Sequence, residues 1–130
     1  MAEKADGQLV LIVEDNEKNM KLARDILQYH GFATVEATTG EDGVALAAAR
    51  QPSVILMDIQ LPGIDGVTAL ERIRREAGTS RIPIVAMTAS VMKEDRERFD
   101  KAGFDGFITK PIDVKRFPDQ IREAIAKGRV

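Results

Sequence analysis

The sequence has no cysteine and no tryptophan, and its 130 residues include one histidine and one tyrosine. The absence of cysteine excludes disulfides, thiolate metal sites and cysteine nucleophiles. The scarcity of aromatic side chains disfavours a flavin site, which usually relies on aromatic stacking. The sole histidine, His30, precedes Gly31 at the expected end of a helix, where we predict a surface residue and not a phosphohistidine.

Long apolar runs and a strong excess of one charge are also missing. The apolar segments are too short to cross a bilayer, and the start, MAEKADGQ, lacks the apolar centre of a signal peptide. The 19 basic and 21 acidic residues give a formal net charge of -2, which is not the footprint of a nucleic-acid binder. We therefore predict a cytoplasmic protein with no membrane insertion and no nucleic-acid partner.

Apolar residues make up 44% of the chain, which at this length suits one domain with a real core. Five short stretches rich in β-branched residues predict strands, three of them apolar at consecutive positions as in strands buried on both faces. They are residues 9–13, 33–37, 54–57, 82–87 and 106–109. Apolar residues between them recur at helical spacing. The alternation predicts an α/β fold with a parallel sheet and helices on both faces.

Each expected helix has a candidate N-terminal cap. The caps are Asn16, Thr39, Asp65, Ser90 and Asp113. In the fourth helix, Val91 and Met92 are predicted to face the core. The last helix should begin late, near Phe117, or bend, because Pro118 cannot donate a backbone hydrogen bond inside a helix.

Polar residues follow four of the five predicted strands. They are Glu14 and Asp15 after the first strand, Asp58 after the third, Thr88 after the fourth, and Lys110 with Pro111 after the fifth. In an open parallel sheet, ligand sites lie beyond the carboxyl ends of the strands. These side chains are therefore expected to converge on one edge of the sheet.

Three carboxylates at one edge repel each other, and a hard divalent cation relieves that repulsion. Mg²⁺ prefers oxygen ligands such as carboxylates, water and phosphate. Lysine adds a point charge suited to phosphate, and a threonine hydroxyl can donate a hydrogen bond to a phosphoryl oxygen. The set suits phosphoryl transfer, with Asp58 as the nucleophile because a carboxylate needs no separate base.

Four segments, LIVEDN, ILMDIQLPGIDG, IVAMTA and FITKPI, occur in this order along the chain. They resemble the signature segments of the receiver (CheY-like) domain of bacterial two-component response regulators. The resemblance covers residues 8–127 and leaves residues 1–7 and 128–130 as expected tails. It implies a flavodoxin-like (βα)5 fold, doubly wound, with a five-stranded parallel sheet of order 2-1-3-4-5.

The resemblance also implies roles for single residues. Asp58 would be the phosphoacceptor, Thr88 and Lys110 would hold the phosphoryl group, and Asp15, Glu14 through water, Asp58 and the backbone carbonyl of Gln60 would bind Mg²⁺. The Lys110–Pro111 peptide bond would be cis. Thr88 and Phe107, where many family members have tyrosine, would form a switch that changes the surface of the fourth helix, fifth strand and fifth helix.

The expected function is that of a stand-alone, single-domain response regulator in a phosphorelay. The chain is similar to regulators of cell division or to receivers cut from hybrid kinases. It would be a signalling phosphoprotein that catalyses only its own phosphorylation and slow dephosphorylation. Its expected partners are a sensor histidine kinase or histidine phosphotransfer protein, and a downstream protein target or adaptor. A monomer or a weak, phosphorylation-dependent dimer is expected.

Other functions stay open on the residues alone. The chain could be a degenerate or phosphorylation-independent adaptor, or a flavodoxin-like mononucleotide binder. A phosphatase of the haloacid-dehalogenase type would need an acid two positions after its nucleophile, where Gln60 cannot transfer a proton. The charged segment KEDRERFDK reads most simply as a solvated helix face, and Gly66 as a helix-packing position.

Overall fold

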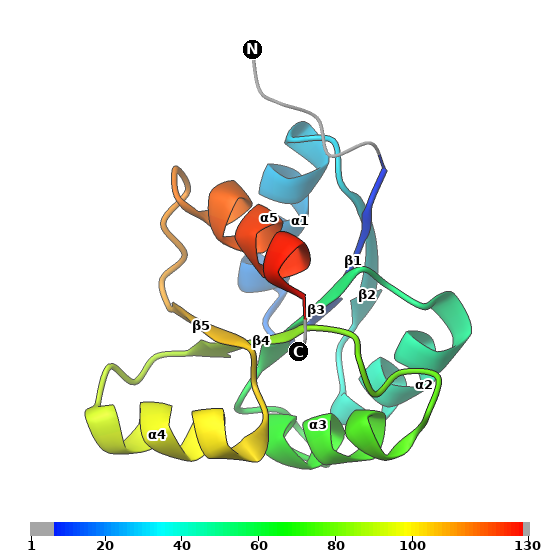
Figure 1. Cartoon of the computed structure of the whole chain (residues 1–130). Helices are drawn as coiled ribbons and strands as arrows, with labels where there is room; N and C mark the ends of the chain where they lie inside the picture. Colours follow the sequence, from blue (N-terminus) through cyan, green and yellow to red (C-terminus); the bar gives the residue numbers. More distant parts are fainter. Residues whose placement is uncertain (1–6, 129–130) are drawn as a thin grey trace.

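The computed structural model describes residues 7–128, so most of the two predicted tails lies outside it. Strands and helices alternate along the whole described chain (Figure 1). In chain order they are β1 (Leu9–Val13), α1 (Glu17–Tyr29), β2 (Ala33–Ala37), α2 (Gly40–Arg50), β3 (Val54–Asp58), α3 (Gly66–Arg75), β4 (Ile84–Thr88), α4 (Lys93–Ala102), β5 (Gly106–Thr109) and α5 (Phe117–Lys127). Among residues 7–128, no helix is long and apolar enough to cross a membrane.

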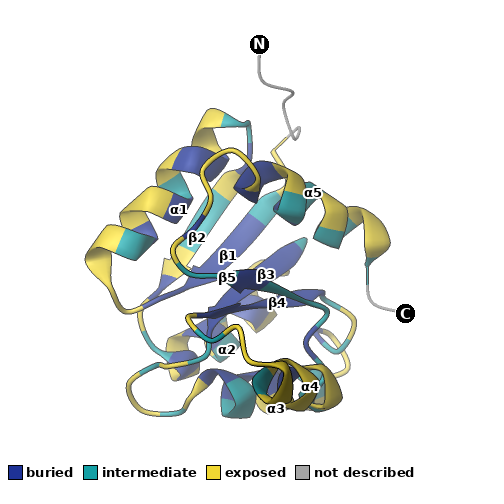
Figure 2. Ribbon diagram, turned by 90° about the vertical axis from the view of Figure 1, so that its left-hand side faces the viewer, coloured by how far each residue is buried: buried dark blue, intermediate teal, exposed yellow. Residues whose placement is uncertain are grey.

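The five strands form one parallel sheet in the order β2-β1-β3-β4-β5. Helices α1 and α5 cover one face, and α2, α3 and α4 cover the other (Figure 1). The predicted flavodoxin-like fold and strand order are therefore confirmed. Figure 2 shows the consequence for burial, with a buried sheet at the centre and exposed residues on the outer sides of the helices.

The core consists of two apolar clusters, one on each face of the sheet. Val10 and Ile12 of β1 point to the face of α1 and α5, where they join Phe117 of α5. Their neighbours in β1 point to the other face and join a cluster that includes Leu70 and Phe99. Successive side chains of a strand alternate between faces, so a strand covered on both sides must be apolar at every position. This explains the uninterrupted apolar stretches of the sequence.

Three of the five predicted helix caps are confirmed. The side chains of Asn16, Thr39 and Asp65 each accept a hydrogen bond from a backbone amide in the first turn of their helices. Helix α5 begins at Phe117 with Pro118 in its first turn, where a missing amide costs nothing, as predicted.

The predicted caps Ser90 and Asp113 are wrong. Helix α4 begins at Lys93, three residues after Ser90, whose hydroxyl bonds to Asp95 and to a loop amide instead. Asp113 accepts from the amides of Lys115 and Arg116 and closes a turn that precedes α5. Neither residue is the N-cap of its helix: the Ser90 hydroxyl links the preceding turn to the first turn of α4, and the Asp113 side chain stabilises a turn in front of α5.

The predicted burial of Val91 and Met92 is also wrong. Their side chains are 67% and 61% exposed. They belong to the turn before α4, because the helix starts two residues later than the apolar spacing suggested. His30 ends α1 as its C-cap, as predicted, and is half-buried, with Nδ1 3.4 Å from the guanidinium of Arg122 in α5.

A half-buried ion pair joins four segments at the end of the sheet opposite the predicted site. Arg74, in the last turn of α3, donates to the carboxylate of Asp105 at 2.7 Å, and to the backbone oxygens of Ser80 and Gly103. Asp105 in turn accepts from the amide of Ile84, at the start of β4, at 2.9 Å. The pair therefore holds together the ends of α3 and α4 and the starts of β4 and β5.

Asp105→Ala should lower the free energy of unfolding by about 2 kcal/mol, because it leaves a half-buried guanidinium and a strand amide without their carboxylate. Urea unfolding monitored by circular dichroism measures this change. Lys93→Ala, which removes an exposed helix ion pair, is the control and should change the value by less than about 1 kcal/mol. Equal effects of the two substitutions would contradict the role given to the Arg74–Asp105 pair.

Gly66, the first residue of α3, packs directly against the end of β3. A Cβ atom at this position would lie 2.4 Å from the carbonyl oxygen of Asp58 and 2.9 Å from the Cα of Ile59. Both are backbone atoms, so no side chain can rotate away to make room. The predicted helix-packing role of Gly66 is confirmed. The small residue lets α3 approach the backbone of Asp58, the candidate nucleophile.

Gly66→Ala should therefore destabilise the protein by about 1 to 3 kcal/mol through overpacking, although Gly to Ala inside a helix is normally stabilising. Gly78→Ala is the matched control, because its nearest neighbour would be a flexible glutamine side chain atom at 3.8 Å. Urea unfolding of the two variants makes the comparison. A stabilised Gly66→Ala protein would show that the backbone moves away easily.

Candidate functional site

The edge of the sheet at the carboxyl ends of the strands brings together the acidic residues singled out from the sequence. Glu14 and Asp15 follow β1, and Asp58 is the last residue of the neighbouring β3. One carboxylate oxygen from each of the three lies within 4.8 Å of the others. Glu14 is only 1% exposed and Asp58 is buried, whereas Asp15 is exposed. The cluster is thus anchored in the core and open to solvent on one side.

Lys110, just after β5, extends its side chain across the end of β4 to reach this cluster. Its Nζ lies 2.8 Å from Asp58 Oδ2 and 2.9 Å from Glu14 Oε1. The contact with Asp58 is a hydrogen bond. The contact with Glu14 is an ion pair in which Oε1 receives no well-directed hydrogen bond, although this oxygen is buried. One ammonium group therefore compensates two carboxylates incompletely.

The incomplete compensation affects the titration of both partners. Burial raises the pKa of Glu14, and the neighbouring Asp58 carboxyl raises it further, while Lys110 and the amide of Asn16 act in the opposite direction. Burial disfavours the charged Lys110, but the contacts of its ammonium group with Asp58 and Glu14 outweigh it and raise the Lys110 pKa. The site holds excess negative charge that a cation would relieve.

Backbone and hydroxyl groups complete the surroundings of Asp58. Its Oδ1 accepts from the amide of Gln60 at 3.1 Å, so both carboxylate oxygens are held from different sides. Thr88, the last residue of β4, is buried and its Oγ1 accepts from the amide of Ser90 at 3.1 Å. The Lys110–Pro111 peptide bond is cis.

Phe107 in β5 lies on the face covered by α4 and does not belong to the polar cluster. It is half-buried, and its ring centroid is 6.3 Å from that of Phe99 in α4. Phe99 itself is buried. The aromatic contact therefore links β5 to α4 beside the site.

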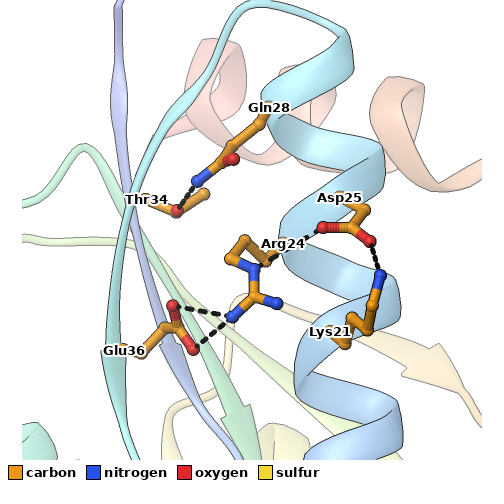
Figure 3. A network of polar contacts seen from close by, with 6 residues as sticks. All are labelled: Lys21, Arg24, Asp25, Gln28, Thr34 and Glu36. Carbon is orange, nitrogen blue, oxygen red and sulfur yellow. Dashed lines mark hydrogen bonds and ion pairs between the residues drawn. The ribbon is translucent and has the colours of Figure 1, made fainter.

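Polar side chains of α1 and β2 lie next to Asp15. A cavity of about 370 Å³ next to Glu14 and Asp15 is lined in part by Arg24 of α1 and Glu36 of β2. Figure 3 shows the guanidinium of Arg24 bonded to the carboxylate of Glu36 at 3.1 Å, and Gln28 bonded to Thr34 further along the strand. These contacts fasten the edge strand to the helix that follows the acidic pair.

A second cavity, of about 380 Å³, opens onto Asp58 from the side of α4. Besides Thr88 and Lys110, its lining includes Asp95 and Arg98. Sequence reasoning missed these two residues, because they belong to the alternating charges of a helix that is otherwise mostly exposed. No local pattern marks them: the turn at residues 89–92 determines which residues of α4 face the cavity.

The chain was compared with known proteins. The family model of the response regulator receiver domain matches residues 10–122. The polar-differentiation response regulator DivK of Brucella ovis is 42% identical over 113 residues, which cover 87% of this chain and 92% of DivK. The resemblance to a DivK-like receiver, carried by the segments VEDNEKNMKL and MDIQLPGIDG, is confirmed.

Solved structures agree. The receiver domain of the sensor histidine kinase PA1611 of Pseudomonas aeruginosa superposes with a TM-score of 0.85 at 32% identity, covering 92% of this chain and 98% of that domain. The chemotaxis response regulator CheY4 of Vibrio cholerae has the same fold, with a TM-score of 0.86 at 21% identity over 91% of this chain and 98% of CheY4. Fold, edge residues and relatives lead to one conclusion: the chain belongs to the response regulator receiver domain family.

Proposed function

We propose that this protein is a response regulator that accepts a phosphoryl group from a partner's phosphohistidine onto Asp58. One observation carries the proposal: the Asp58 carboxylate stands at a sheet edge between Lys110, at 2.8 Å, and two further carboxylates. A 42% identical relative, DivK, is named as a response regulator. Receiver domains are signalling proteins and not enzymes that turn over external substrates.

The chain's own residues would perform the transfer by positioning and charge stabilisation. Gln60 and Lys110 each hold one oxygen of the Asp58 carboxylate, so its orientation is set before a donor arrives. A new bond would form between an Asp58 oxygen and phosphorus as the bond from phosphorus to the partner's ring nitrogen breaks. The product is an acyl phosphate, and the leaving imidazole is neutral because its other nitrogen carries a proton. Lys110 and the Thr88 hydroxyl would then face phosphoryl oxygens.

The residues of the edge also fit a divalent cation. Three carboxylates with oxygens within 4.8 Å, one of them buried with an oxygen that receives no hydrogen bond, form the hard oxygen environment that Mg²⁺ prefers. We assign Asp15 and Asp58 as direct ligands, Glu14 through water, and the Gln60 carbonyl as a further ligand. Bound Mg²⁺ would supply positive charge that screens these carboxylates from incoming phosphoryl oxygens. The similar PA1611 receiver domain carries a coordinated magnesium ion in its active site cleft.

The signal would leave the site through the side of α4, β5 and α5. Thr88 is one strand away from Phe107, whose ring contacts Phe99 in α4. Phe107 has no hydroxyl, so its rearrangement would be purely apolar. A sensor histidine kinase or histidine phosphotransfer protein upstream, and a protein target or adaptor downstream, are the partners this function requires.

Incubation with acetyl phosphate and Mg²⁺ should add the mass of one phosphoryl group to the wild-type protein, and the adduct should be labile to alkali as an acyl phosphate is. Asp58→Asn should gain nothing, because an amide is a poor nucleophile. Intact-protein mass spectrometry measures both. An equal gain in the variant would place the acceptor elsewhere.

A receiver that reacts only with its kinase could resist acetyl phosphate. For that case, Mg²⁺-dependent binding of beryllofluoride, observed by ¹⁹F NMR, replaces the phosphodonor. Binding to the wild type and not to Asp58→Asn supports the proposal. The absence of both the phosphoryl adduct and beryllofluoride binding would overturn it in favour of a phosphorylation-independent adaptor.

Mg²⁺ should raise the thermal midpoint of the wild-type protein, because it binds the folded acidic edge and relieves carboxylate repulsion. Asp15→Asn should remove most of this rise while leaving the midpoint in EDTA equal or higher, since it removes one repelling charge. Differential scanning fluorimetry at constant ionic strength makes the measurement. Asp25→Asn, on the outer side of α1 (Figure 3), is the control and should keep the full response.

A further inference from the structure

Helix α4 starts without a side-chain cap of its own. Its N-cap residue, Met92, has no side chain that can accept a hydrogen bond. The hydroxyl of Ser90 stabilises the start of the helix instead, because it accepts from the amide of Met92 at 3.2 Å and donates to Asp95 Oδ2 at 2.6 Å. Ser90 lies two residues before the N-cap and Asp95 is the third residue of the helix, so the contact closes the turn onto the helix.

The same Ser90 is also bonded to the candidate phosphoryl site. Its backbone amide donates to Thr88 Oγ1 at 3.1 Å. Ser90 therefore links two elements, with its amide on the last residue of β4 and its hydroxyl on the first turn of α4. A displacement of the Ser90 side chain would change the direction of the amide that holds the Thr88 hydroxyl.

Asp95 is placed to fix this arrangement. Its carboxylate borders the cavity that opens onto Asp58, together with Ser90 and Thr88. The second carboxylate oxygen, Oδ1, lies 3.5 Å from the guanidinium of Arg98 one turn later, which holds the side chain toward the cavity. A hydrogen bond from a hydroxyl to a charged acceptor is stronger than one between neutral groups.

We propose that Asp95 is a positioning residue for phosphoryl transfer at Asp58, acting through Ser90 on the Thr88 hydroxyl. Asp95 anchors the Ser90 hydroxyl, Ser90 holds the turn at residues 89–92, and the Ser90 amide orients Thr88. Asp95 does not touch the reacting atoms. This inference rests on the proposed function, which makes Thr88 a phosphoryl-binding residue.

The kinetic test compares rates of phosphorylation of Asp58 by acetyl phosphate. Asp95→Ala and Ser90→Ala should each slow the reaction roughly threefold to tenfold, because Thr88 is less well oriented. Asp95→Asn should recover most of the wild-type rate, since its carbonyl oxygen still accepts from the Ser90 hydroxyl. Glu97→Ala, an exposed acid of the same helix, is the matched control and should react at the wild-type rate.

Two double variants test the route of the effect. Asp95→Ala should add no further slowing to Ser90→Ala or to Thr88→Ala, because all three remove the same chain of contacts. If instead the negative charge of Asp95 matters, Asp95→Asn will behave as Asp95→Ala does, and both will react faster with the anionic donor. That result, or equal rates in all variants while the wild type is phosphorylated, overturns the inference and leaves the proposed function intact.

Hydrogen exchange tests the same contacts without a phosphodonor, so failure of the proposed function cannot hide the answer. In Asp95→Ala the amides of Ser90 and Met92 should exchange about tenfold faster, because the turn opens more often. Asp95→Asn and Glu97→Ala should exchange as the wild type does. Unchanged exchange in Asp95→Ala would show that Asp95 does not hold the turn, and would overturn the inference whatever the phosphorylation result.

Discussion

Repulsion between carboxylates that the fold forces together is the constraint on which this site depends. Glu14 directly follows β1 and Asp58 ends the neighbouring β3, and neither side chain can move away from the other because both are buried. Lys110 lies within 3 Å of an oxygen of each but satisfies Glu14 incompletely. In the proposed function, the remaining negative charge would attract a cation, and the cation would in turn allow an anionic phosphoryl group to approach. The carboxylate cluster thus destabilises the folded protein locally, at the proposed phosphorylation site.

The rest of the molecule keeps this edge rigid. Gly66 lets α3 pack against the backbone of Asp58, and this contact restricts the movement of the residue that carries the carboxylate. At the opposite end of the sheet, the Arg74–Asp105 pair joins helices to strands and fixes β4 relative to β5. Thr88 and Lys110 come from these two strands or directly follow them. The distances around Asp58 therefore depend on contacts made at both ends of the sheet.

The side of α4 differs from this rigid frame. The exposed apolar residues Val91 and Met92 precede the helix, and its first turn is held by the side chain of Ser90 and its partner Asp95. Few buried contacts and a short polar link are features of segments that can change conformation at low cost. The contrast between a fixed acidic edge and a weakly fastened helix suits a domain that receives a signal at one place and presents it at another.

Periodicity determined most of the architecture, because a parallel sheet covered on both faces requires apolar strands alternating with helices, and that pattern is local in the sequence. The same periodic pattern placed the acids, Thr88 and Lys110 at the ends of strands. Parallel strands bring their carboxyl ends to one edge of the sheet whatever the details of packing. The predicted start of α4 was wrong because the Ser90 hydroxyl bonds to Asp95 and Ser90 is not the N-cap of the helix. The role of Asp95 could be inferred only from the tertiary structure. It depends on a contact with Ser90 and on a shared cavity, and neither produces a periodic pattern in the sequence.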